Sequence, residues 1–185
     1  MEWSILGGVV LLLIWLFMTY NGLVAMNQRA NQAFADIDVQ LKQRHDLIPN
    51  LIETVKGYAA HEKETFDAVV KARNTALTAS GPAAQGAAEH ALGGALGRLL
   101  ALSEAYPNLK ANANFLDLQA KLASVEDKLA AARRFFNSAV SEFNASVQSI
   151  PAVFFAKNFG FVPRPFFDVG EGARVTLDKP PEVKF

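Results

Sequence analysis

The chain has 185 residues, of which 18 are basic and 18 are acidic, so its formal net charge is zero. This balance argues against a nucleic-acid binder, which usually carries a clustered basic excess. The chain has no cysteine, which excludes a lipidated cysteine anchor. Alanine is abundant, whereas runs of β-branched residues and hairpin dipeptides are scarce, and this composition predicts an almost entirely helical protein.

The first predicted element is a membrane span. Glu2 is the only charge in the first 28 residues, and the run over 3–20 is mostly apolar. A helix of about 20 apolar residues crosses a hydrocarbon core roughly 30 Å thick, and Trp3, Trp15 and Tyr20 are suited to the interfaces. The start lacks the basic residues of a signal peptide and offers only a poor cleavage site. We therefore predict an uncleaved anchor over residues 1–28.

The charges around this span predict its orientation. Arg29, Lys42 and Arg44 follow the apolar run, and no Lys or Arg precedes it. Basic residues mark the cytoplasmic side of a span. We expect a single-pass protein of the cell (inner) membrane, with its N-terminus outside and the remaining domain in the cytoplasm.

The next predicted element is a long helical seam. Over residues 21–79 apolar side chains recur at heptad spacing, in a row formed by Phe34, Leu41, Ile48, Val55, Val69 and Ala76. Because no Gly-Pro linker separates the span from this seam, we expect the span to continue as helix into the following domain. Gly81 and Pro82 mark its end.

Glu62 and Arg44 interrupt the apolar seam, and Pro49 lies inside the same pattern. Pro49 lacks a backbone donor and its ring clashes with the carbonyl of His45, so the helix kinks there or a new helix begins after a cap at Asp46. The unbroken apolar phase favours the kink. Arg44 falls at an inward position, and we expect its side chain to extend to the edge of the bundle. A buried ion pair that fixes the register is the alternative.

Two more helices are predicted over 83–105 and 111–149, separated by a break at Tyr106 and Pro107. Gly93 and Gly97 lie one turn apart in the first of them, which indicates either a closely packed neighbouring helix or a frayed segment.

Together these elements predict an antiparallel up-and-down four-helix bundle with coiled-coil-like seams over 29–150. An aromatic-rich segment and an extended tail follow over 151–185. Six phenylalanines lie close together here, at positions 154, 155, 159, 161, 166 and 167. We expect the segment to fold back and cap the bundle. The alternative is a membrane or partner patch formed by Phe154, Phe155, Phe159 and Phe161.

No catalytic, cofactor or metal motif is evident. His61 and Glu62 begin like a zincin motif, but Thr65 stands where the second histidine would be. There is no Glu-x-x-His pair for a di-iron site, and the glycines over 93–97 match no phosphate loop. The three histidines are expected on solvated faces. We predict neither an enzyme nor a cofactor.

Four stretches of the chain resemble the LemA family. They are Tyr-Asn-Gly-Leu-Val at 20–24, the run over 36–51, Glu-Ala-Tyr-Pro-Asn-Leu-Lys-Ala at 104–111, and Arg-Arg-Phe-Phe-Asn, Phe-Asn and Pro within 133–151. Phe136 and Phe143 stand where the family frequently has tyrosine. The resemblance implies a membrane-anchored four-helix bundle of bacteria without known enzymatic activity, often encoded near membrane proteases.

The family motifs contain polar residues that need hydrogen-bond partners if they are buried. We expect a shared network at the two helix breaks, serving either structure or partner binding, and formed by Arg44, Asp46, Glu104, Tyr106, Asn137 and Asn144. The partners expected are the membrane, other envelope proteins including a membrane protease, and a second copy of the chain, but no nucleic acid. The function expected is a non-enzymatic membrane-anchored scaffold or adaptor of the bacterial cell envelope. Lipid-surface binding or membrane remodelling through the aromatic segment is the alternative.

Overall fold

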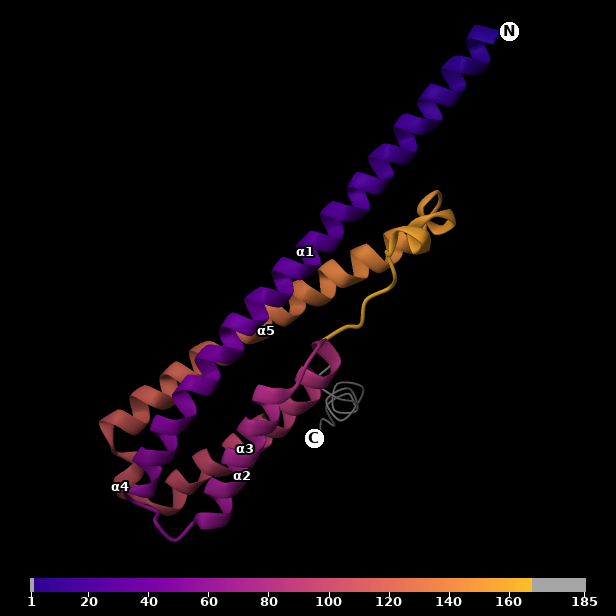
Figure 1. Ribbon diagram of the computed structural model, residues 1–185. Helices are drawn as coiled ribbons and strands as arrows, with labels where there is room; N and C mark the ends of the chain where they lie inside the picture. Colours follow the sequence, from indigo (N-terminus) through magenta and orange to yellow (C-terminus); the bar gives the residue numbers. More distant parts are fainter. Residues whose placement is uncertain (1, 168–185) are drawn as a thin grey trace, which may run out of the picture. The chain divides into compact units, whose positions relative to one another are not determined.

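The computed structural model describes residues 2–167, and all regular structure in that range is helical (Figure 1). The all-α prediction is therefore confirmed. The described residues form two compact units. The first unit comprises residues 2–37 and 131–166, and the second comprises residues 38–130 with Phe167. The extended tail predicted over the last residues lies outside the described range from residue 168 onward.

Helix α1 (Glu2–Lys56) contributes to both units and continues without interruption through Pro49. No new helix begins at Asp46, so the alternative of a second, capped helix is wrong, and the kink at Pro49 stays a prediction. The seam predicted over 21–79 breaks instead at 57–62, between α1 and α2 (Lys63–Thr78). The prediction missed this break because Val55 and Val69, on either side of it, happen to keep the heptad phase.

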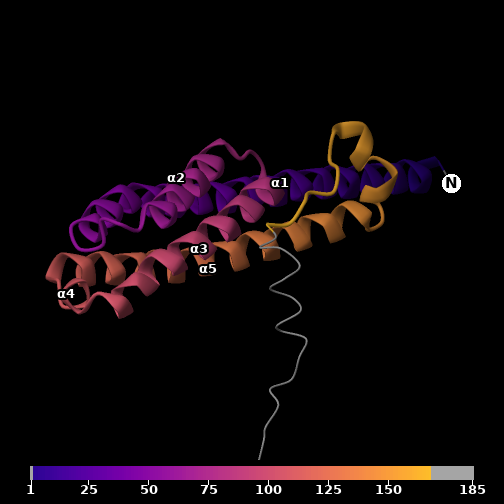
Figure 2. The ribbon, with the colours of Figure 1, turned by 90° about the horizontal axis from the view of Figure 1, so that it is seen from below.

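The first unit is built on α1 and the later part of α5 (Ala113–Gln148), which lie side by side in Figures 1 and 2. Small side chains of α1 leave room for large ones of α5: Ala30 and Ala33 are fully buried, and the Phe34 and Phe136 ring centroids are 5.4 Å apart. Two short 3-10 helices, η1 (Ala152–Phe154) and η2 (Ala156–Phe159), follow α5. A cluster of buried apolar side chains joins them to α1 and α5: Leu23, Phe143, Val147, Ala152, Ala156 and Phe161.

The second unit gathers the end of α1, α2, α3 (Pro82–Ala105), α4 (Pro107–Lys110) and the start of α5 around one apolar core. Helices α2 and α3 run side by side (Figure 2). Two side-chain hydrogen bonds join the loop after α1 to the segment around α4. Tyr106 Oη donates to Glu62 Oε1 at 3.1 Å, and Asn112 Nδ2 donates to Tyr58 Oη at 2.8 Å. The antiparallel up-and-down order of a four-helix bundle stays a prediction.

Helix α3 is continuous through its glycines. A methyl group built on Gly97 would meet no atom within 4 Å, so no neighbouring helix approaches there. At Gly93 the nearest atom is Nη2 of Arg44, 3.4 Å from such a methyl group. The close neighbour of this segment is therefore the Arg44 side chain at Gly93. The two glycines do not mark a closely packed neighbouring helix, and α3 is not interrupted at them.

Candidate functional site

Four charged or titratable side chains of the second unit form a buried charge cluster: Arg44, His45, Glu89 and Glu126. Arg44 Nη1 lies 2.7 Å from Glu89 Oε2, and Arg44 Nε lies 2.7 Å from Glu126 Oε1. Only 5% of Arg44 and 3% of Glu89 are exposed. The expectation that Arg44 extends to the edge of the bundle is wrong, and the alternative of a buried ion pair is right. The reason is that α3 brings the Glu89 carboxylate to the same buried face of α1.

His45 is the second side-chain partner of the Glu89 carboxylate. Its Nε2 lies 2.6 Å from Glu89 Oε1, and the histidine is 5% exposed. This contact and the one from Arg44 give each oxygen of the buried carboxylate a partner. The prediction of a solvated histidine is wrong at this position because His45 lies one turn from both Leu41 and Ile48 on the buried stripe of α1. His61 and His90 are exposed as predicted.

The cluster also borders the backbone group that Pro49 releases. A proline cannot donate to the carbonyl four residues earlier, which here belongs to His45. Arg73 Nε on α2 donates to that carbonyl oxygen at 3.0 Å. This hydrogen bond gives a partner to a part-buried acceptor that the helix leaves open, and α1 continues through the proline.

The other predicted polar residues of the second unit have separate partners. Asp46 is exposed and pairs with Lys42 at 2.8 Å. The hydrogen bond from Lys42 lowers the pKa of the Asp46 carboxyl from its ordinary value of 3.8. Glu104 is exposed and pairs with Lys110. The hydrogen bond to Glu62 raises the pKa of Tyr106 above its ordinary value of 10.0. These contacts do not bring Asp46, Glu104 and Tyr106 into the charge cluster around Arg44.

In the first unit, Asn144 holds the segment that returns after η2. Its Nδ2 donates to the Arg164 carbonyl at 2.9 Å, and its Oδ1 accepts from the Arg164 backbone N–H at 2.7 Å. Arg164 Nη1 donates to Oδ1 of Asn27 at 3.0 Å and to Oδ1 of Asn31 at 2.6 Å. We call these four residues the Arg164 clasp. Asn137, the other asparagine of the predicted polar network, is half-buried on α5.

An aromatic groove forms the second candidate site. It has a volume of about 470 Å³ and is lined by α1 and by the 3-10 helices, through Leu13, Leu16, Phe17, Tyr20, Phe155 and Phe159. The Tyr20 ring meets the rings of Phe159 and Phe161 edge to face, with centroids 5.3 and 5.6 Å away.

The four phenylalanines of the predicted patch divide by exposure. Phe161 is buried and caps the first unit, whereas Phe155 is half-buried. Phe154 and Phe159 point outward, with 76% and 61% exposed. Trp3 and Trp15 on α1 are exposed as well. The aromatic segment therefore folds back onto the first unit through Phe161 and also exposes the rings of Phe154 and Phe159.

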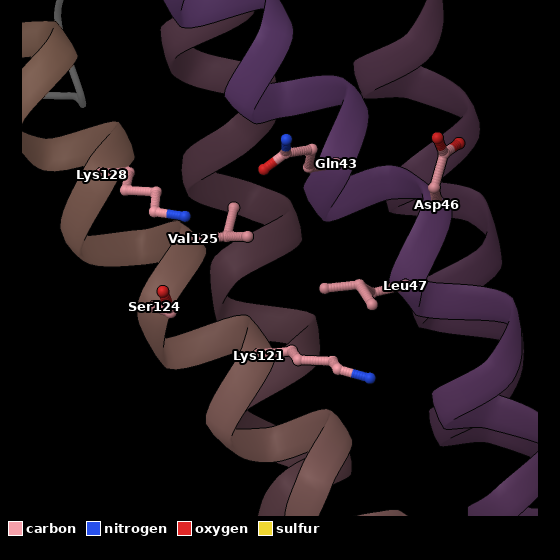
Figure 3. Close-up of a pocket in the computed structure, with 7 residues that line it drawn as sticks. All are labelled: Gln43, Asp46, Leu47, Lys121, Ser124, Val125 and Lys128. Atoms are coloured by element: carbon pink, nitrogen blue, oxygen red, sulfur yellow. The ribbon is translucent and has the colours of Figure 1, made fainter.

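The third candidate site is a depression in the second unit that is lined mainly by polar residues. Figure 3 shows side chains of α1 and α5 on its two sides, and Gln43, Asp46, Leu47, Lys121, Ser124, Val125 and Lys128 line its volume of about 350 Å³. Asp46 and Lys121 already have exposed partners in Lys42 and Asp117. Within residues 2–167 no group of three or more His, Cys, Asp or Glu side chains is placed to hold a metal ion.

Sequence reasoning missed Glu89 and the role of Arg164. Glu89 lies three residues before Leu92, and the buried stripe of α3 continues through Leu96 and Leu99 to Ser103. The same helical spacing could have placed Glu89 inward, as a partner for the inward Arg44. No comparable signal exists for Arg164, because its contacts join residues far apart in the sequence.

The fold and these sites define an all-α protein whose N-terminal helix is long and apolar enough to cross a membrane. The chain belongs to the LemA family, whose family model matches residues 33–185. The family resemblance predicted from the motifs is therefore confirmed.

Three similar proteins are named magnetosome proteins. The magnetosome protein MamQ of Magnetospirillum gryphiswaldense is 26% identical over 178 residues, covering 82% of this chain and 65% of that protein. MamQ 1 and MamQ 2 of Paramagnetospirillum magneticum are each 26% identical over 185 residues, covering 86% of this chain and 68% of those proteins. The chain thus spans about two thirds of the length of these relatives.

Proposed function

We propose that this protein is a non-enzymatic, membrane-anchored scaffold or adaptor of the bacterial cell envelope. The observation that carries the proposal is the exposed apolar start of α1, where Leu11 is 69% and Phe17 is 67% exposed. A contiguous apolar surface of this kind is unfavourable in water, and its length suits a bilayer core of about 30 Å. The same helix runs on into the second unit and ties it to the anchor.

The buried charge cluster supports a structural role for the second unit. The Glu89 carboxylate is closed off by Arg44 and His45, so its oxygens are committed to holding α1 and α3 together. The relatives named magnetosome proteins support a part in a larger cellular assembly.

The partners proposed are other envelope proteins, a membrane protease among them, or a second copy of the chain. The basic residues after the span favour a cytoplasmic position for the part of the chain that follows the span. Exposed apolar side chains on the helices of the second unit offer contact points, among them Val39, Val70, Leu77 and Leu116.

Photocrosslinking in intact cells tests the adaptor role. A photoreactive amino acid would replace Val39, Val70, Leu77 or Leu116 in the full chain, one position at a time. We expect neighbouring positions to capture the same membrane or envelope protein, or a second copy. Asp127, an exposed charged residue of α5, provides a matched control site. Recovery of only the uncrosslinked chain from every position would contradict the proposal.

Membrane remodelling through the aromatic segment is the second candidate function. The exposure of Phe154 and Phe159 favours it, because exposed aromatic side chains next to a span are suited to a membrane interface. Electron microscopy of vesicles that contain the reconstituted full chain tests it. Vesicles that keep their shape at every protein density would eliminate remodelling without affecting the adaptor role.

A further inference from the structure

The aromatic groove occupies a defined depth along α1. Its α1 residues extend from Leu13 to Tyr20, at the end of the uncharged run that starts at Trp3. With a rise of about 1.5 Å per residue, a bilayer core of about 30 Å that begins at Trp3 ends near Gly22. The groove therefore lies within the leaflet that the C-terminal end of the span enters. The rings of Phe155 and Phe159, which close the groove, lie at the same depth.

The backbone of the 3-10 helices is suited to that depth. Backbone groups in hydrocarbon need partners inside the protein, and irregular segments rarely provide them. Here the N–H groups of residues 153–155 and 158–161 all donate to carbonyls of residues 149–157. Gly160, with φ of 81°, makes the left-handed turn that lets the Phe161 N–H reach the Ala156 carbonyl at 2.9 Å.

The exposed side chains of this segment are those of Val153, Phe154, Lys157, Asn158 and Phe159, so they are mostly apolar and none is acidic. Ile150 is 72% exposed, Phe154 is 76% exposed and Phe159 is 61% exposed. No Asp or Glu occurs over 143–167 or over 3–35, whereas Lys157 lies on η2 itself. Such a face is compatible with lipid tails and with anionic headgroups, which attract basic side chains.

The Arg164 clasp lies beyond the end of the hydrocarbon core, on the side that faces water. Asn27 and Asn31 lie about two to three turns beyond Tyr20 on α1. Because the clasp holds the return segment at that level, the 3-10 helices are fixed beside the last turns of the span.

We propose that η1 and η2 are immersed in the leaflet entered by the C-terminal end of the span, where Ile150, Phe154 and Phe159 contact acyl chains and one acyl chain occupies the aromatic groove. This inference rests on the proposed anchoring by α1. The segment makes a wedge in one leaflet only, so the protein occupies more area in that leaflet than in the other.

Depth-dependent quenching tests the immersion. Because the chain has no native cysteine, a single introduced one takes an environment-sensitive fluorophore at a unique place. Full-length Phe154→Cys and Phe159→Cys would be labelled and reconstituted in phosphatidylcholine–phosphatidylglycerol vesicles that contain phosphatidylcholine with brominated acyl chains. Leu11→Cys serves as the control for the span, and Leu77→Cys on α2 as the control for an exposed apolar site. Circular dichroism verifies that each variant is folded.

We expect labels at Phe154 and Phe159 to be quenched as at Leu11, and several-fold more strongly than at Leu77. Quenching at Leu11 with water-like emission at both phenylalanine positions would overturn the immersion and leave the anchor intact. Absence of quenching at Leu11 would overturn the anchor and the inference together. Blue-shifted, unquenched emission at Phe154 and Phe159 would show that protein covers this face, which also overturns the inference.

The clasp provides a second test. In the Phe159→Cys background, Asn144→Ala removes both hydrogen bonds to the Arg164 backbone. We expect quenching at position 159 to change while quenching of a Leu11 label in the same Asn144→Ala background stays the same. Unchanged quenching at both positions would contradict the role of the clasp in setting the depth of the segment.

Discussion

Glu89 shows how a single residue determines the packing of the second unit. Its two oxygens face an arginine on one side and a histidine on the other, and all three side chains are buried. Removing one partner of a buried ion pair leaves an uncompensated charge, which costs far more than the intact pair contributes. The only carboxylate left to Arg44 would be that of Glu126, whose side chain is 42% exposed.

We therefore expect Glu89→Ala to lower the free energy of unfolding by about 3–5 kcal/mol. Urea unfolding in detergent, followed by circular dichroism, measures this change. Glu53→Ala is the matched control, since Glu53 pairs with Lys56 on the surface of α1 and its side chain is 75% exposed. The control should change the free energy by no more than about 1 kcal/mol. Equal losses in the two variants would contradict the importance of the buried cluster.

At the scale of the element, two glycines have opposite roles. Gly97 lies inside α3 with open space where a side chain would begin, so its cost is only that of glycine in a helix. Gly160 ends η2 in a left-handed conformation that other residues adopt with difficulty.

Gly97→Ala should therefore raise the free energy of unfolding by up to about 1 kcal/mol. Gly160→Ala should lower it by about 1–2 kcal/mol, because the new side chain is strained at positive φ. Chemical denaturation of the two variants side by side measures both changes. Stabilisation by Gly160→Ala, or destabilisation by Gly97→Ala, would contradict these assignments.

For the whole molecule, the exposed apolar start of α1 is the feature from which we predict membrane anchoring. A charged side chain at the centre of a span costs about 2.5–3.5 kcal/mol. Leu11 and Leu12 lie near the middle of the apolar run. Replacing both by arginine should release the chain from membranes washed with alkaline carbonate, whereas the unchanged protein should remain. Leu77→Arg, on an exposed face of α2, should not alter retention. Full retention of the double variant would contradict a single span at this position.

The sequence by itself determined the helical class, the family and the apolar N-terminal helix. Each depends on a local pattern, because heptad spacing, uncharged length and short motifs are properties of neighbouring residues. The same patterns could not locate the end of α1 at Lys56, since Val55 and Val69 keep one phase across the break. They also identified Arg44 as inward but assigned it to the wrong environment.

Only the tertiary structure decided what the polar residues do. Arg44 and Glu89 are 45 positions apart, and Asn27 and Arg164 are 137 apart, so no local pattern pairs them. The carbonyl that Pro49 leaves open takes its partner from Arg73 on another helix. Burial makes such pairings obligatory, because a charge or a carbonyl without a partner is costly away from water. Which residue satisfies it depends on the way the helices meet, and that arrangement exists only in the folded chain.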